Sequence, residues 1–374
     1  MSLHTDSLRV ALSRRRFYRS KQPSVSWWKV LLPRMATSWL ICRLRIWTSC
    51  LVDNLSCSPR ICAAGLRICS VEVQKMILHR LRRVKELLTS PTYRRVLLCR
   101  IYCRLLRHLN PNLRYLGLAD GNETTFMFLH DNVVTPYTVA VGHFARNDLE
   151  AVLKLCAKVG KSLGGTFLDV GANIGTTTIY ALKSGSFNKA VCIEPAPSNL
   201  EVLRLNMEAN GIAEKVIVSP HAVSTAKGQL KLALSKENCG DHRIQGNPTS
   251  AAGTSVDVDV DTLDNLLVTH QVDAASVSLV WCDTQGHEGF VLAGSESLIR
   301  RQVPFCIEFC PHDLVDAGSY EQLIKIIEQK FEKFAEVGGQ HAGEFLPTER
   351  IRDFAKKFDG TIYHTDLFLI PRPV

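Results

Sequence analysis

The segment that most constrains the fold of this chain is residues 167–175, Phe-Leu-Asp-Val-Gly-Ala-Asn-Ile-Gly, where an apolar run leads directly into a glycine loop. The run over 167–170 suits a strand that is covered on both faces of a sheet. Gly171 and Gly175 let the backbone turn sharply and come close to a ligand, since neither carries a Cβ atom. We predict that a helix over 176–183 follows and points its unpaired N–H groups into the loop.

A second buried strand is predicted to end at Glu194, which opens the sequence Glu-Pro-Ala-Pro-Ser-Asn at residues 194–199. A strand, a glycine loop, a helix and a second strand that ends in an acid form the layout of a nucleotide-type cofactor site in a parallel α/β sheet. The Glu194 carboxylate can accept hydrogen bonds from both hydroxyl groups of a ribose. The pattern therefore predicts a site for a cofactor that contains ribose.

The spacing of the loop distinguishes two classes of cofactor. A dinucleotide fingerprint reads Gly-x-Gly-x-x-Gly, which lets a pyrophosphate lie against the helix N-terminus. Here Asn173 takes the place of the second glycine, and Asp169 at the loop entrance would repel a pyrophosphate but suit an amino group. S-adenosylmethionine has an ammonium, a sulfonium and a ribose but no phosphate, so we expect it as the cofactor. A dehydrogenase site and a tight turn without any ligand are the alternatives.

Beyond residue 115, segments with strand and helix patterns alternate, which predicts an α/β fold with a doubly wound, mostly parallel sheet. We expect strands within 125–142, an amphipathic helix over 147–159 and an added hairpin strand over 228–234. Residues 236–256 are rich in Gly, Asn, Ser and Thr, and we expect a mobile loop there. The remaining predicted elements are helices over 199–210, 289–300 and 320–331 and strands over 215–218, 278–282, 305–307 and 367–370.

The net charge of +9 conceals an uneven distribution along the chain. Residues 1–114 hold 23 Lys and Arg against 4 Asp and Glu, a net charge of +19, and the rest of the chain has a net charge of −10. Over 76–109, leucines and isoleucines recur every three or four residues among arginines, a basic amphipathic pattern that Pro91 and Pro111 should divide into short helices. The predicted parts are a basic extension over 1–75, a basic helical segment over 76–114 and the main domain over 115–374.

Three interpretations of residues 1–70 stay open: an organellar transit segment, a basic arm that contacts membrane or nucleic acid, and an over-extended start before Met76. The 13 cysteines show no Cys-x-x-Cys spacing, so we predict no metal site and expect reduced thiols and a cytoplasmic protein, with organellar targeting as the alternative. No apolar run reaches about 18 residues, so we expect no spanning helix. Weak contact of the basic segment with a membrane surface is a further expectation, and a stable nucleic acid partner is not expected.

Three motifs together resemble the FkbM family of class I S-adenosylmethionine-dependent methyltransferases: Asp-Val-Gly-Ala-Asn-Ile-Gly at 169–175, Glu-Pro-x-Pro-x-Asn at 194–199 and Asp-x-Gln-Gly-x-Glu at 283–288. The first two indicate the class and the third indicates the family, and the resemblance runs from about residue 130 to about residue 370. It implies a Rossmann-like seven-stranded sheet and S-adenosylmethionine as cofactor. Many such enzymes are O-methyltransferases, so the expected partner is a small hydroxyl-bearing acceptor such as a sugar or polyketide.

The resemblance also implies which residues hold the cofactor. The first motif would line the methionine moiety, Glu194 would hold the ribose, and Asn199 would support the loop of Glu194. The predicted cofactor-binding residues are Asp169, Gly171, Ala172, Asn173, Gly175, Glu194, Pro195 and Asn199.

The third motif departs from the family pattern, which usually has Lys-Ile before the aspartate and a small residue before the glutamate. Here Trp281 and Cys282 precede Asp283, and His287 replaces the small residue. Methyl transfer from a sulfonium is an in-line displacement, so the enzyme must position the acceptor and remove its hydroxyl proton. We predict Asp283 as the catalytic residue, with His287 as an alternative base whose ordinary pKa is closer to neutrality.

Structural roles are the alternatives for several side chains near this motif. His287 could face solvent at a helix N-terminus, and Glu288 could cap that helix. Glu308 ends a predicted strand, where a buried structural acid is as plausible as a functional one. His242 and His312 are expected at the surface.

Two other functions remain open. An RNA methyltransferase could use the basic N-terminal segment as its electrostatic footprint, although no Asn/Asp-Pro-Pro-aromatic signature is present. A cofactor-binding protein without catalysis could act through partners. Tight cofactor binding without turnover of any acceptor would favour that last function.

Overall fold

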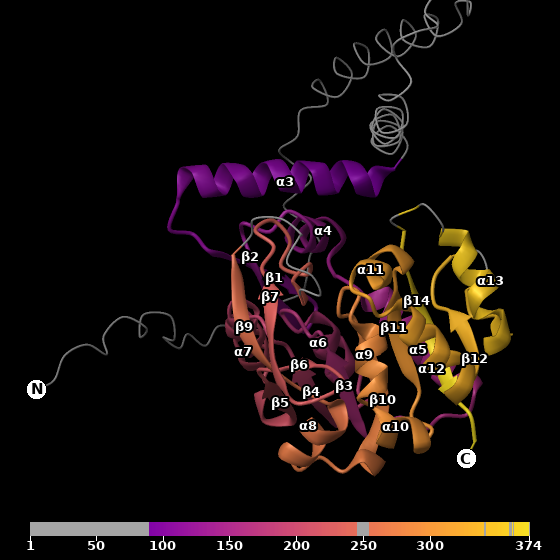
Figure 1. Ribbon diagram of the computed structural model, residues 1–374. Coiled ribbons are helices and arrows are strands. Elements are labelled where there is room, and N and C mark those ends of the chain that lie inside the picture. Colours follow the sequence, from indigo (N-terminus) through magenta and orange to yellow (C-terminus); the bar gives the residue numbers. More distant parts are fainter. Residues whose placement is uncertain (1–89, 245–253, 340–341, 359–360, 362, 374) are drawn as a thin grey trace, which may run out of the picture. The chain divides into compact units, whose positions relative to one another are not determined.

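The structure of the chain is a computed structural model that describes residues 90–244, 254–339, 342–358, 361 and 363–373 (Figure 1). The chain divides into two units, Met1–Ile77 and Leu78–Val374, and every described residue belongs to the second. The predictions for residues 1–89 lie outside the described residues.

A mixed eight-stranded sheet forms the centre of the Leu78–Val374 unit. In order across the sheet, its strands are β13 (Phe345–Pro347), β12 (Phe331–Glu336), β14 (Thr365–Pro371), β11 (Phe305–Phe309), β10 (Val277–Cys282), β3 (Thr166–Val170), β4 (Lys189–Ile193) and β5 (Val216–Ser219). The five strands from β11 to β5 run parallel, while β14 is antiparallel to β11 and β12, and β13 is antiparallel to β12. The predicted Rossmann-like α/β class is confirmed, with β13 as a short eighth strand at the edge.

The central strands are largely apolar, as suits strands that helices cover on both faces of the sheet. On β3, Phe167 packs into the core on one face, and Leu168 and Val170 pack into the core on the other. The core on the face of Phe167 includes residues of α5 (Arg146–Lys158), α6 (Thr176–Lys183) and α7 (Pro197–Ala209). The core on the face of Leu168 and Val170 includes residues of α8 (Leu263–Thr269), α9 (Glu288–Ala293), α10 (Glu296–Arg300), α11 (Pro311–Asp316), α12 (Tyr320–Lys330) and α13 (Ile351–Ala355).

The helix predicted over 289–300 is two helices, so that prediction was wrong in its continuity. The chain turns at Gly294 between α9 and α10, where a Cβ atom would lie 2.4 Å from the carbonyl oxygen of Ser224. The close approach of another backbone segment therefore interrupts a helical sequence pattern. Short 3₁₀ turns occupy Ala213–Lys215, Ala274–Ser276, Thr348–Arg350 and Lys356–Phe358.

A second sheet of four strands lies beyond β5 in the sequence. Its strands, in order, are β6 (Ala222–Val223), β9 (Ser255–Asp261), β7 (Gly228–Ala233) and β8 (Arg243–Ile244). The strand predicted over 228–234 is present as β7, but the expected loop over 236–256 contains β8 and the start of β9. The apolar side chains of this sheet form a core with Ala196, in the segment that follows Glu194.

The first described residues form α3 (Pro91–Leu109), followed by the hairpin of β1 (Tyr115–Asp120) and β2 (Glu123–Phe128) and then by α4 (Val134–Val141). Pro91 begins α3 and does not break it, since proline suits the first helical turn. The strands predicted within 125–142 were half wrong, because 134–141 is helical. The buried Asp131 carboxylate accepts hydrogen bonds from the N–H groups of Val133 and Thr135, which supports the first turn of α4. Among the described helices, none is both long enough and apolar enough to cross a membrane.

Candidate functional site

A pocket lies at the carboxyl ends of β3, β4 and β10, where parallel sheets of this kind bind their ligands. Three loops that follow these strands form its floor, and the four-stranded sheet forms one wall. Of the predicted cofactor-binding residues, the lining includes Gly171, Asn173, Glu194, Pro195 and Asn199. Both predicted catalytic residues, Asp283 and His287, also belong to the lining.

Gly171 lies where two of these loops touch. Its φ of 82° is in the left-handed region, and a Cβ atom there would lie 1.8 Å from the carbonyl oxygen of Asp283. The N–H of Asp283 donates to the carbonyl of Val170 at 3.0 Å. The backbone after β3 is thus held directly against the backbone after β10, which is the close approach that the glycine permits.

Glu194 organises the loop as well as lining the pocket. Its side chain is buried, and its two oxygens accept hydrogen bonds from the N–H groups of Asn173 and Ala196, each at 2.8 Å. Burial raises the pKa of Glu194 to about 7, against the opposing effect of these hydrogen bonds. The carboxylate therefore connects the glycine loop to the start of α7, and a carboxylate oxygen retains capacity to accept a further hydrogen bond.

Two amide oxygens in the lining have no donor. The side-chain oxygens of Asn173 and Asn199 are buried and accept no hydrogen bond from the described residues. The Asn199 amide nitrogen is engaged, because it donates to the carbonyl of Cys239 at 2.9 Å. Buried acceptors are normally satisfied, so these two oxygens suit a ligand that carries hydroxyl or ammonium donors.

The structure places Asp169, Ala172 and Gly175 outside the pocket lining. The Asp169 carboxylate is buried and accepts a hydrogen bond from the hydroxyl of Thr178 on α6 at 2.6 Å. Burial raises its pKa to about 7. A Cβ atom on Gly175 would lie 2.7 Å from the methyl group of Met207, so this glycine serves the packing of α7 on the loop.

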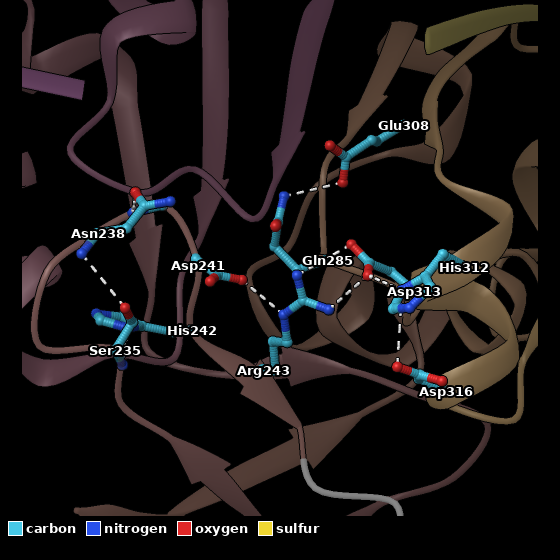
Figure 2. A network of polar contacts seen from close by, with 12 residues as sticks. Ser235, Asn238, Asp241, His242, Arg243, Gln285, Glu308, His312, Asp313 and Asp316 are labelled. Carbon is cyan, nitrogen blue, oxygen red and sulfur yellow. Dashed lines mark hydrogen bonds and ion pairs between the residues drawn. The ribbon is translucent and has the colours of Figure 1, made fainter. Parts of the chain in front are cut away.

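Asp283 and Glu308 are linked through Gln285, whose contact with Glu308 is drawn in Figure 2. The Gln285 amide nitrogen donates to the Asp283 carboxylate at 2.7 Å and to the Glu308 carboxylate at 2.9 Å. Burial raises the pKa of Asp283 and, together with the Asp283 charge, raises that of Glu308 well above its ordinary value. Gln285 was predicted only as part of a motif, because the pairing that places the strand of Glu308 beside β10 is decided by the fold.

His287 is buried and not solvent-facing, so that alternative was wrong. Its Nε2 lies 3.3 Å from the hydroxyl oxygen of Ser224, and its ring lies against that of Phe290. Burial lowers the pKa of His287 to about 4, so the ring is neutral at neutral pH. Glu288 was considered as a cap of the helix, but its carboxylate instead holds the turn before α9: it accepts from the N–H and hydroxyl of Thr284 at 2.7 and 2.9 Å, and burial raises its pKa to about 7.

The prediction of a surface position for His242 was wrong, because this side chain lines the pocket wall. Its Nδ1 accepts a hydrogen bond from the N–H of Ser235 at 3.0 Å. His221 lines the same wall, and its Nδ1 lies 2.9 Å from the hydroxyl oxygen of Ser219. No pattern near the motifs points to either histidine, since the four-stranded sheet brings them to the site. His312, by contrast, has a side chain that is 49% exposed, as expected.

An ion-pair clamp holds this wall in place (Figure 2). The Arg243 guanidinium on β8 donates to the carboxylates of Asp241 and Asp313, with the latter paired at 2.8 and 3.0 Å. Burial alone would raise the pKa of Asp313, but Arg243 brings it below its ordinary value. Because Asp313 lies on α11, directly after β11, the clamp joins the four-stranded sheet to the main sheet beside the pocket.

One family model and several solved structures are similar to this chain. Residues 169–345 match the model of the methyltransferase FkbM domain. No curated protein matches the chain. Similar solved structures include an FkbM methyltransferase from Methylobacillus flagellatus KT, at 14% identity and a TM-score of 0.34 over 64% of this chain and 66% of that one.

Two further structures are similar. Cofactor-bound Rv0187 from MTB has 13% identity and a TM-score of 0.36, over 63% of this chain and 83% of that one. TYW2 from P. horikoshii, solved in complex with MeSAdo, has 10% identity and a TM-score of 0.35, over 70% of this chain and 72% of that one. The matched residues 169–345 contain all three motifs, so the match to the methyltransferase FkbM domain agrees with the resemblance that these motifs predicted.

Proposed function

We propose that this methyltransferase domain uses S-adenosylmethionine to methylate a hydroxyl group of a small substrate. The observation that carries the proposal is a single pocket in which the glycine loop and Glu194 face Asp283, while the described lining contains neither Lys nor Arg. The first side would hold the cofactor, and the second would hold the acceptor.

The residues of the first side fit this cofactor. The unpaired oxygens of Asn173 and Asn199 and the Glu194 carboxylate are acceptors, and they would hold ribose hydroxyls or the ammonium group. A pyrophosphate would meet these acceptors without a cationic side chain in the described lining, which argues against a dinucleotide. Bound S-adenosylmethionine would supply an electrophilic methyl group.

On the second side, Asp283 would orient the acceptor hydroxyl and hold its proton. Burial raises the pKa of Asp283, so its carboxylate is a stronger base than an exposed aspartate. Gln285 donates to it at 2.7 Å and would keep the carboxylate in one orientation. His287 is neutral near pH 7, and burial lowers its pKa to about 4, which makes it a weaker base than an ordinary histidine.

The charge of the pocket favours an uncharged acceptor. Glu194, Asp283 and the adjoining Glu308 are acidic, and Arg243 beside them is already paired with two carboxylates. An acceptor with phosphate groups would find no unpaired Lys or Arg in the described lining, whereas a neutral polyol or a polyketide hydroxyl needs none. The pocket thus favours a small hydroxyl compound over RNA.

Calorimetric titration of the full chain with S-adenosylmethionine, S-adenosylhomocysteine and NAD tests the cofactor. Saturable binding of the first two without NAD is expected, and binding of NAD alone would refute the proposal. Methyl transfer to a panel of small hydroxyl compounds and to RNA then tests the acceptor. Tight cofactor binding with no turnover on any of them would favour a protein without catalysis.

A further inference from the structure

Helix α3 presents an apolar stripe to the outside of the Leu78–Val374 unit. It packs against α4 and buries Val96 and Cys103 (Figure 1). On a helix, positions three or four residues apart share a face, and the exposed large apolar residues of α3 have this spacing. They are Leu98 (54% exposed), Ile101 (55%), Tyr102 (44%), Leu105 (52%) and Leu109 (71%).

The charged residues of α3 itself have one sign. The 19 residues of α3 include five arginines and no acidic residue. Exposed Arg95 lies beside the stripe at one end of the helix, and exposed Arg104 flanks it further along. An aliphatic stripe with arginines on its flanks and a tyrosine within it is the pattern of a helix that lies in the plane of a membrane interface.

The length and charge of α3 favour lying on a bilayer and not crossing it. At 1.5 Å per residue, its 19 residues extend for about 28 Å. Five arginines within that length would be costly in the hydrocarbon core, and α3 is not apolar enough to span. Along the interface, the same arginines would face lipid headgroups while the leucines enter the acyl boundary.

We propose that α3 docks this protein on the surface of a bilayer that contains anionic lipid. The apolar stripe enters the interface, and the flanking arginines pair with the headgroups. Charge complementarity selects this occupant: a second copy of the helix would bring five more arginines against the first five, and RNA would leave the leucines without a partner.

Vesicle flotation with the full chain tests the proposal, using neutral phosphatidylcholine vesicles and vesicles that also contain phosphatidylserine. We expect binding to the anionic vesicles that weakens as salt is raised. The variant Leu98→Gln with Leu105→Gln should lower the partition coefficient by on the order of tenfold. The variant Arg95→Gln with Arg104→Gln should lower it by about fivefold per arginine on anionic vesicles only.

A matched control distinguishes an effect of the α3 stripe from a general effect of removing exposed apolar side chains. Val268 on α8 and Val315 on α11 are 78% and 61% exposed, so Val268→Gln with Val315→Gln removes comparable exposed side chains elsewhere. This control should bind vesicles like the unaltered chain, and unchanged thermal midpoints would show that all variants fold.

Three results would overturn the proposal. Vesicle binding that survives both α3 variants would place the membrane contact on another segment. A dimer in light scattering that the leucine variant alone dissociates would make the stripe a contact between copies. Retention of RNA, lost in the arginine variant, by a chain that ignores vesicles would make α3 a nucleic acid surface.

Discussion

Replacing Gly171 with alanine should lower the free energy of unfolding, mainly for two reasons. The first is conformational, because a φ of 82° costs a residue with a Cβ atom about 1–2 kcal/mol. The second is steric, because the new Cβ would lie 1.8 Å from the Asp283 carbonyl oxygen, more than 1 Å inside normal contact. Overpacking of this kind adds about 1–3 kcal/mol or more. Weakening of the adjacent Asp283–Val170 hydrogen bond adds about 1 kcal/mol.

Gly185 provides the matched control. Its φ of 75° carries a similar conformational cost, but no atom lies within 4 Å of where its Cβ would be. Gly185→Ala should therefore lower the free energy of unfolding by about 1–2 kcal/mol, and Gly171→Ala by about 3–6 kcal/mol. In thermal unfolding, at about 2–4 °C per kcal/mol, the two midpoints should differ by about 5–15 °C. Equal midpoints would refute the close contact of the loops after β3 and β10.

Three further predictions concern the pocket. Glu194→Ala should weaken S-adenosylmethionine binding by about 1–3 kcal/mol in calorimetry, and unchanged affinity would remove Glu194 from the ribose. Asp283→Asn should lower kcat by about a hundredfold or more with little change in cofactor affinity, whereas a larger loss in His287→Gln would make the histidine the base. Burial raises the pKa of Glu194 to about 7, so protonation of this group stabilises the fold below its unfolded pKa of 4.5, and that contribution is lost as the pH rises through about 7. Between about pH 5 and about pH 8, the thermal midpoint of Glu194→Gln should therefore rise relative to that of the unaltered chain. A difference between the two midpoints that does not change with pH would contradict the raised pKa.

The elements that the sequence predicted correctly are those whose signals are local. The run over 167–170 became β3, and the helix predicted over 176–183 has those bounds, because an apolar strand, a left-handed glycine and a helix start are specified by neighbouring residues. The errors arose where distant groups decided the outcome. Asp131 supports α4 in a segment with strand-like alternation, and the backbone near Ser224 interrupts a helix at Gly294.

The motifs by themselves indicated the class of domain, the strand ends that carry its acids and the glycine loop that lines the pocket. Only the tertiary structure decided which of those side chains reach the pocket. Asp169 accepts a hydrogen bond from Thr178 and does not line the pocket. His242 lies outside the motifs, but the four-stranded sheet places it in the pocket wall. The tertiary structure also decided that Gln285 joins Asp283 to Glu308, because the pairing of strands distant in sequence sets which residues meet at a sheet edge.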